Sequence, residues 1–187
     1  MKTAAHCLLA SLLACTAGAA QAYYVDAATG YPGKATIRAS GACAFPQQTY
    51  YNAWLGDVYD NSDVYQGWGI VGDSGELLAL EVTGAETRYR HNSVTGVGYQ
   101  DYYVDMAGVA LADYIYNHSF CDPAALAPVF SSGEHYRWDT MKGEETVRVV
   151  VKAKGYDESQ CIKQNGIESC QAARFSATLT FSGAVYY

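Results

Sequence analysis

The dipeptide Asn165-Gly166 constrains the fold of this chain more than any other feature of its sequence. Asn and Gly most readily adopt the positive φ angles of a two-residue type I′ turn, so the dipeptide predicts a tight β-hairpin. Counting outward from the turn places Lys163 opposite Glu168 and Cys161 opposite Cys170. The cysteines fall at a non-hydrogen-bonded pair, where Cα atoms lie about 4.5 Å apart, a separation that suits a disulfide. The sequence therefore predicts a C-terminal hairpin closed by its own disulfide.

The longer arms of this hairpin do not continue in the same register. Apolar residues occupy alternate positions from Val147 to Ala153 in the first arm and from Phe175 to Phe181 in the second. With the turn at Asn165-Gly166, these two sets would face opposite sides of a sheet. Either a β-bulge near Gly155 shifts the register by one residue, or the arms part near Gly155 and join different sheets.

The N-terminus has the organisation of a secretory signal peptide. One Lys precedes an apolar run, and small residues end in Ala20-Gln21-Ala22, which is a typical cleavage site. We expect residues 1–22 to be removed and residues 23–187 to form a single exported β-rich domain, in the periplasm, outside the cell or on its surface. Alternatively, Leu12-Leu13-Ala14-Cys15 is a lipobox, and Cys15 would carry a lipid anchor. No later segment is apolar over about 18 residues, so no transmembrane helix is expected.

Four cysteines remain once the leader is removed, and in an exported domain they predict two disulfides. Three connectivities are possible for the set Cys43, Cys121, Cys161 and Cys170. If the hairpin joins Cys161 to Cys170, the second bridge joins Cys43 to Cys121 and ties the two halves of the chain together.

The remaining sequence alternates short apolar-polar stretches with Gly-rich turns, which favours an antiparallel β-sandwich, with a β-barrel as the alternative. The expected strands cover residues 23–27, 35–40, 64–71, 78–82, 87–90, 99–106 and 109–116. Gly84 is expected to separate two of these strands. The one expected helix is a short turn at residues 122–126, where Asp122-Pro123 is a good helix start.

The most suggestive functional feature is an aromatic segment, residues 50–68, in a chain with 17 Tyr and only 5 Phe. Its rings are interleaved with Asn, Asp and Gln, a mixture that suits stacking on a sugar and bonding of its hydroxyls, or a protein interface. The candidate ligand-binding residues are Tyr50, Tyr51, Trp54, Tyr59, Tyr65 and Trp68. The alternative is that most of these rings pack in the core.

Other signals are weaker. Asp57, Asp60, Asn61 and Asp63 could bind Ca²⁺ weakly, although a solvated acidic loop is the simpler interpretation. His91, His118 and His135 are scattered without metal-ligand spacing, and no cofactor is expected. The net charge of −7 and the absence of a basic cluster in the sequence argue against nucleic acid as a partner.

Two short segments resemble segments of known protein families. Gly72-Asp73-Ser74-Gly75 resembles the segment around the nucleophilic serine of trypsin-like proteases, which implies hydrolysis. However, Glu76 follows where that family has glycine, and residues 23–73 contain no histidine. An ordinary strand-to-strand turn is therefore the favoured interpretation.

The alternation at Ala177, Leu179 and Phe181 before Tyr186 resembles the C-terminal strand of chaperone-usher pilin subunits. Residues 35–43 also resemble the first strand of those subunits, which runs into a cysteine. Pilin subunits pair their cysteines over a shorter interval and lack the Asn-Gly hairpin, so no family is assigned.

The leading functional hypothesis is an exported, non-catalytic β-sandwich that binds a glycan or protein through residues 50–68. The second is a structural subunit of a surface fibre, in which the last strand pairs with a neighbour. The third is a small secreted hydrolase that uses Glu134, His135 and Asp139, the one local cluster of acids and imidazole.

The predicted disulfides can be tested directly. Non-reducing peptide mapping of the exported protein should find Cys161 joined to Cys170 and Cys43 joined to Cys121, because the Asn-Gly turn fixes which residues face each other. A bridge from Cys43 to Cys161 or Cys170 would contradict the hairpin register.

Overall fold

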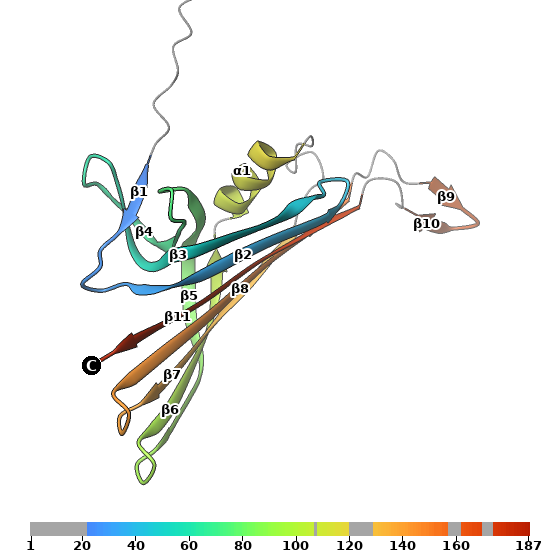
Figure 1. Cartoon of the computed structure of the whole chain (residues 1–187). Coiled ribbons are helices and arrows are strands. Elements are labelled where there is room, and N and C mark those ends of the chain that lie inside the picture. Colours follow the sequence, from blue (N-terminus) through green and yellow to red (C-terminus); the bar gives the residue numbers. More distant parts are fainter. Residues whose placement is uncertain (1–21, 107, 120–128, 157–161, 170–173) are drawn as a thin grey trace, which may run out of the picture.

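The protein folds as a nearly all-β structure in which one antiparallel sheet is curled into a half-barrel (Figure 1). This computed structural model describes residues 22–106, 108–119, 129–156, 162–169 and 174–187. The prediction of an antiparallel β fold is confirmed.

The strands of the main sheet vary widely in length. They are β1 (Tyr23–Val25), β2 (Tyr31–Gly41), β3 (Phe45–Asp60), β4 (Tyr65–Val71), β5 (Leu77–Asn92), β6 (Val97–Met106), β7 (Val129–Asp139), β8 (Glu144–Gly155) and β11 (Phe175–Tyr186). Helix α1 (Gly108–His118) follows β6, and a separate hairpin of β9 (Ile162–Gln164) and β10 (Ile167–Ser169) follows β8.

The order of strands in the sheet is β1-β3-β2-β11-β8-β7-β6-β5-β4, and all neighbours are antiparallel. Most neighbours in the sheet are therefore consecutive in the chain, as in a meander. An additional pairing joins β4, the last strand of this order, to β3, the second. The last strand, β11, lies in the middle, between β2 and β8.

The C-terminal hairpin forms with the predicted register. Asn165 and Gly166 have φ angles of 53° and 79°, and Lys163 pairs with Glu168. Figure 1 shows this hairpin, β9 and β10, projecting away from the main sheet. Cys161 and Cys170 lie outside the described residues, so the disulfide that would close the hairpin stays a prediction.

The arms that lead into the hairpin pair with each other, one residue out of step with the hairpin itself. Gly155 faces Phe175, and the pairing continues without interruption to Glu144 and Tyr186. Of the two alternatives left open by the sequence, the one-residue offset is confirmed and arms that join different sheets are wrong. Because of the offset, the apolar positions of both arms share one face, as burial requires.

Two expectations about individual elements are wrong, and one strand was not predicted. Residues 109–116 form most of helix α1 rather than a strand, and Gly84 lies inside the continuous strand β5. Residues 45–60 form the single long strand β3, which the sequence did not predict. The expected helix at 122–126, Cys121 and the proposed leader and lipid site up to residue 21 lie outside the described part of the chain.

Helix α1 packs on the core because its apolar residues recur at helical spacing. Leu111, Tyr114 and Ile115 are at most 2% exposed, which is the i, i+3, i+4 pattern of an amphipathic helix. They join a core built by the alternate residues of β2, β8 and β11, among them Ile37, Val149 and Leu179. In a short segment this apolar spacing also fits a strand, which explains the wrong prediction.

Buried polar contacts tie this helix to the sheet. The hydroxyl of Tyr50 donates a hydrogen bond to Glu76 at 2.5 Å and lies 2.9 Å from the hydroxyl of Tyr114. Burial and the bond to Glu76 raise the pKa of Tyr50 well above 10, so its proton stays in place. The ring of Tyr114 stacks on His118 at 3.9 Å. Among the described residues, no helix is both long enough and apolar enough to cross a bilayer.

The role of α1 predicts a difference between two substitutions. Leu111→Ala should lower the free energy of unfolding by about 2 to 5 kcal/mol, because it leaves a cavity at a fully buried position. Tyr116→Ala on the same helix should have little effect, since Tyr116 is 60% exposed. Urea unfolding of both variants measures this; equal losses would mean that the helix does not close the core.

Candidate functional site

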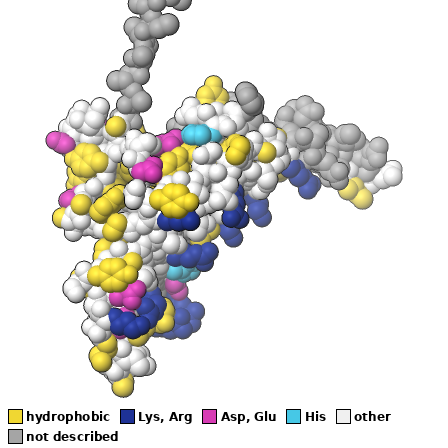
Figure 2. All heavy atoms as spheres, viewed as in Figure 1, with side chains coloured by type: hydrophobic (Ala, Val, Ile, Leu, Met, Phe, Trp, Pro, Cys, Tyr) yellow, Lys and Arg dark blue, Asp and Glu magenta, His cyan; other side chains and the backbone are white. Residues whose placement is uncertain are grey.

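Basic side chains gather on the face of the sheet that points away from the core, here called the outer face. Strand alternation puts the residues next to buried positions on this face: Lys34 precedes Ala35, and Arg148 precedes Val149. The exposed basic residues placed in this way are Lys34, Arg38, Arg148, Lys152 and Lys154. Figure 2 shows Lys and Arg side chains along one flank of the sheet.

The sequence interpretation missed this cluster because its members are far apart along the chain. The cluster could have been found from the basic residues that occupy alternate positions on two strands, β2 and β8, which both pair with β11. Lys34 and Arg38 lie on β2, whereas Lys152 and Lys154 lie on β8. The expectation of no nucleic-acid partner depended on the absence of a basic cluster in the sequence, whereas the folded sheet carries such a cluster although the net charge of the chain is −7.

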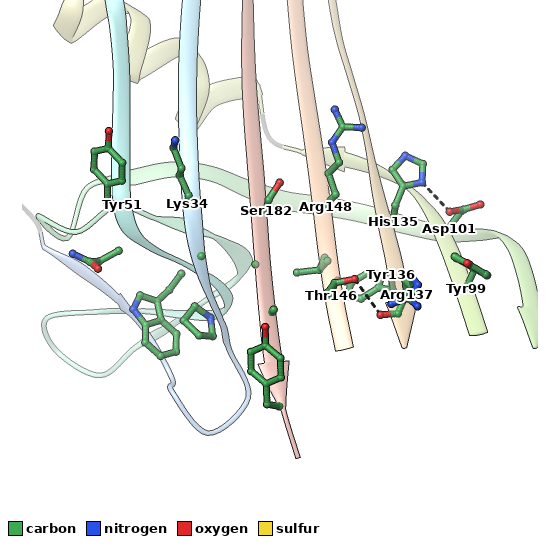
Figure 3. Close-up of a pocket in the computed structure, with 18 residues that line it drawn as sticks. Lys34, Tyr51, Tyr99, Asp101, His135, Tyr136, Arg137, Thr146, Arg148 and Ser182 are labelled. Carbon is green, nitrogen blue, oxygen red and sulfur yellow. Dashed lines mark hydrogen bonds and ion pairs between the residues drawn. The ribbon is translucent and has the colours of Figure 1, made fainter. Parts of the chain in front are cut away.

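A row of polar side chains crosses the outer face in register. Lys34 pairs with Ser182, Ser182 with Arg148, Arg148 with His135 and His135 with Asp101. Figure 3 shows these side chains on adjacent strands and pointing to one side, with Tyr51 of β3 next in line beside Lys34. The row, here called the transverse row, runs from β3 to β6.

Two contacts fix the ends of the transverse row. Asp101 Oδ1 lies 2.8 Å from His135 Nδ1, so that the carboxylate orients the imidazole. Lys34 Nζ lies 5.0 Å from the centroid of the Tyr51 ring, a cation–π contact. Between them, within the described chain, neither Lys34 nor Arg148 forms an ion pair with a carboxylate. Positive charge on this row is thus available to a ligand.

The transverse row lies in a groove of about 960 Å³, here called the outer groove. Its rings and polar side chains include Tyr51, Asn52, Trp54, Tyr99, Thr146, Ser182 and Tyr186. Arg90 lies over the ring of Tyr99 at 5.3 Å, beside the groove. Cations, hydroxyl and amide groups and partly exposed rings together suit a ligand that carries both negative charge and flat apolar surface.

The six aromatic residues expected to form one platform are distributed over separate places. Tyr50 is in the core, 9% exposed, whereas Tyr51 is 70% exposed in the outer groove, which Trp54 also lines. Trp68 packs against the core and lines a pocket on the inner face. Strand alternation separates Tyr50 from Tyr51, since neighbouring positions on β3 face opposite sides. The pairing of β3 with β2 shifts register between Gly33 and Ala35, which interrupts the alternation, and Trp54 lines the same groove as Tyr51.

The remaining two rings, Tyr59 and Tyr65, lie beside the acidic loop. Tyr59 stacks on Tyr24 at 5.6 Å and meets Tyr65 edge-on. In that loop, Asp60 Oδ1 accepts hydrogen bonds from the backbone of Ser62 and Val64, and Asp63 accepts one from Tyr24. These carboxylates stabilise the turn. Within the described chain, no three His, Cys, Asp or Glu side chains lie together in a way that could hold a metal ion.

The residues proposed for hydrolysis are not brought together. Glu134 and His135 are consecutive on β7 and point to opposite faces: Glu134 is 3% exposed, and His135 is exposed beside Asp101. Asp139 is paired with Arg137 at 3.2 Å. Ser74 is exposed in the turn between β4 and β5, where Gly72 N–H donates to the Glu76 carbonyl. The protease-like motif therefore forms an ordinary turn.

Comparisons with protein-family models, with curated proteins and with solved structures gave no match to this chain. The chemistry of the outer groove and of the residues around it consequently carries the evidence on function.

Proposed function

We propose that this protein is an exported, non-catalytic β domain that binds an acidic polysaccharide through the outer groove. The observation that carries the proposal is the transverse row, in which Lys34 and Arg148 are exposed and unpaired with any described carboxylate. A carboxylated sugar chain would supply their missing counter-charges. Export follows from the predicted leader at residues 1–22.

The length and chemistry of the row favour an extended chain over a small ion. The row crosses six neighbouring strands from β3 to β6, which at about 4.8 Å per strand spacing spans about 24 Å. Rings lie at both ends, Tyr51 on β3 and Tyr99 on β6, where sugar rings can stack. Ser182 and Asn52 add groups that hydrogen-bond with sugar hydroxyls.

The fibre-subunit alternative is less well supported by the position of the last strand. Along residues 175–183, β11 pairs with β2 on one side and with β8 on the other. Its main-chain donors and acceptors are therefore used inside the chain. Pairing with a neighbouring subunit would require displacement of one of these strands.

The charge requirement can be tested with matched polymers. The mature protein should bind polygalacturonate, and its fully methyl-esterified form should bind at least about tenfold more weakly, because the ester keeps the sugar rings and removes the charge. Binding should weaken further as salt is raised, as expected for exposed charges. Isothermal titration calorimetry measures both. Equal affinity for acid and ester would contradict the proposal, and tighter binding of single-stranded DNA would replace the polysaccharide with nucleic acid.

The location can be tested with two variants that lose the same charge on the same face. Arg148→Ala should weaken polygalacturonate binding about tenfold, because a charge-assisted hydrogen bond is lost inside the outer groove. Lys152 lies on the same face of β8, four residues after Arg148, and does not line the groove. Lys152→Ala should therefore weaken polygalacturonate binding less than about threefold. Equal losses of affinity in the two variants would indicate that the polymer is attracted to the whole basic face and does not bind in the groove.

A further inference from the structure

The inner face of the sheet holds a second pocket whose chemistry is opposite to that of the outer groove. It has a volume of about 400 Å³ and is here called the inner pocket. Its lining is formed by Tyr31, Trp68, Glu81, Gly84, Gln100, Tyr102, Glu134, Tyr136, Trp138 and Glu145. Strands β2, β4, β5, β6, β7 and β8 all contribute. The lining therefore combines three carboxylates with five aromatic rings and contains no Lys or Arg.

The central group of the inner pocket is Glu134, which is only 3% exposed. The hydroxyl of Tyr136 donates a hydrogen bond to Glu134 Oε2 at 2.6 Å. The other oxygen, Oε1, is buried and accepts no hydrogen bond of ordinary geometry from the described residues, although the side chain of Trp68 lies close enough to the carboxyl group to lower its pKa. A buried carboxylate oxygen without a well-placed donor is costly, and the usual compensation is a bound water or another group that donates.

The other two carboxylates differ in how far they are satisfied. Glu145 accepts hydrogen bonds from the hydroxyls of Tyr31, at 2.6 Å, and of Tyr187. Glu81 on β5 is partly buried, and burial raises its pKa. Glu81 also acts on Glu134 through its negative charge. The pocket therefore concentrates negative charge without a cation in its lining.

The rings around Glu134 are held in fixed orientations. Tyr136 meets Tyr31 edge-on at 5.8 Å and Tyr102 edge-on at 5.7 Å. Trp138 lies flat on the backbone of Gly98, where an added Cβ would come within 2.0 Å of the indole. Preformed rings beside a carboxylate are the arrangement that binds ammonium groups through cation–π contacts and a charge-assisted hydrogen bond.

We propose that the inner pocket binds the ammonium group of a primary amine, with one N–H donating to Glu134 Oε1 and the rings covering the cation and its alkyl arm. A quaternary ammonium offers the same charge but no N–H, so it cannot satisfy this oxygen. A neutral alcohol offers a donor but no charge. The pocket should therefore prefer a primary amine over both.

Proton release should accompany binding. Burial raises the pKa of Glu134 to about 7, although the side chains of Tyr136 and Trp68 oppose the shift. Above pH 7 the carboxylate is ionised and ready for a cation, whereas below pH 7 it must first lose a proton. Affinity should hence be constant from about pH 8 to about pH 9 and fall up to tenfold for each unit below pH 7, since an alkylammonium with a pKa of about 10.4 stays charged over this range.

Other titratable groups also face Glu134. They are Glu81 on β5, Glu145 on β8, Tyr31 on β2, Tyr102 on β6 and Tyr136 on β7. His91 stacks on Trp138 with ring centroids 6.4 Å apart and is a further titratable group beside the pocket. A variant at Glu134 separates its contribution from theirs.

Calorimetry with n-pentylammonium chloride tests the proposal. The mature protein should bind it at least about tenfold more tightly than tetramethylammonium or 1-pentanol. Binding should also change the tryptophan fluorescence of Trp54→Phe, which keeps the two pocket indoles, Trp68 and Trp138. Absence of binding at millimolar amine, or equal affinity for the alcohol, would overturn the proposal.

Two variants locate the site. Glu134→Gln keeps the shape and should weaken amine binding about tenfold to hundredfold and abolish its pH dependence below pH 7. Arg148→Ala, in the outer groove, should leave amine binding unchanged, so failure of the polysaccharide proposal would not affect this one. Circular dichroism should show both variants folded. Unchanged affinity or unchanged pH dependence in Glu134→Gln would overturn the proposal.

Discussion

The alternation of side chains along each strand is the constraint on which the rest of this structure depends. In a strand, consecutive residues point to opposite faces, so a single sheet can carry two unrelated chemistries. On β7, Glu134 is buried at the inner pocket, whereas His135 is exposed in the outer groove. On β8, Val149 packs in the core and its neighbour Arg148 faces outward. Because the strands are paired in register, the same assignment of alternate residues to the two faces repeats across the sheet. One face is therefore basic, and the other carries an acidic pocket.

The net charge of the chain does not describe the charge of each face. The chain carries a net charge of −7, yet Arg148, Lys152 and Lys154 lie together on one face. A local concentration of one sign attracts a ligand of the opposite sign even when the whole protein repels it. At the inner pocket, burial raises the pKa of Glu134 and makes an oxygen without a well-placed donor costly. A cation that donates a hydrogen bond to this carboxylate would therefore be favoured there. Helix α1 and the Tyr50–Glu76 bond close the core at the other end of the sheet.

The features that the sequence predicted correctly depend on contacts between residues close in the chain. The Asn165-Gly166 turn and the Lys163–Glu168 pair follow from local turn geometry. The one-residue offset between the long arms was one of two alternatives that the alternation left open, and only their pairing in the sheet decides for it. The helix was missed because Leu111 and Ile115 fit both a strand and a helix, and packing against the core decided between them. The outer groove and the inner pocket were missed because their residues come from six strands each, and only strand order and register bring them together.

Hydroxyl-radical footprinting with polygalacturonate bound tests most directly the claim that the two faces have separate chemistries. It reports the solvent exposure of individual side chains, and both faces carry aromatic residues that react. Tyr51 and Tyr99, on the outer face, should become protected, whereas Tyr102 and Trp138, at the inner pocket, should react as in the free protein. Protection of Tyr102 and Trp138 with no change at Tyr51 and Tyr99 would contradict the assignment of the acidic ligand to the outer groove.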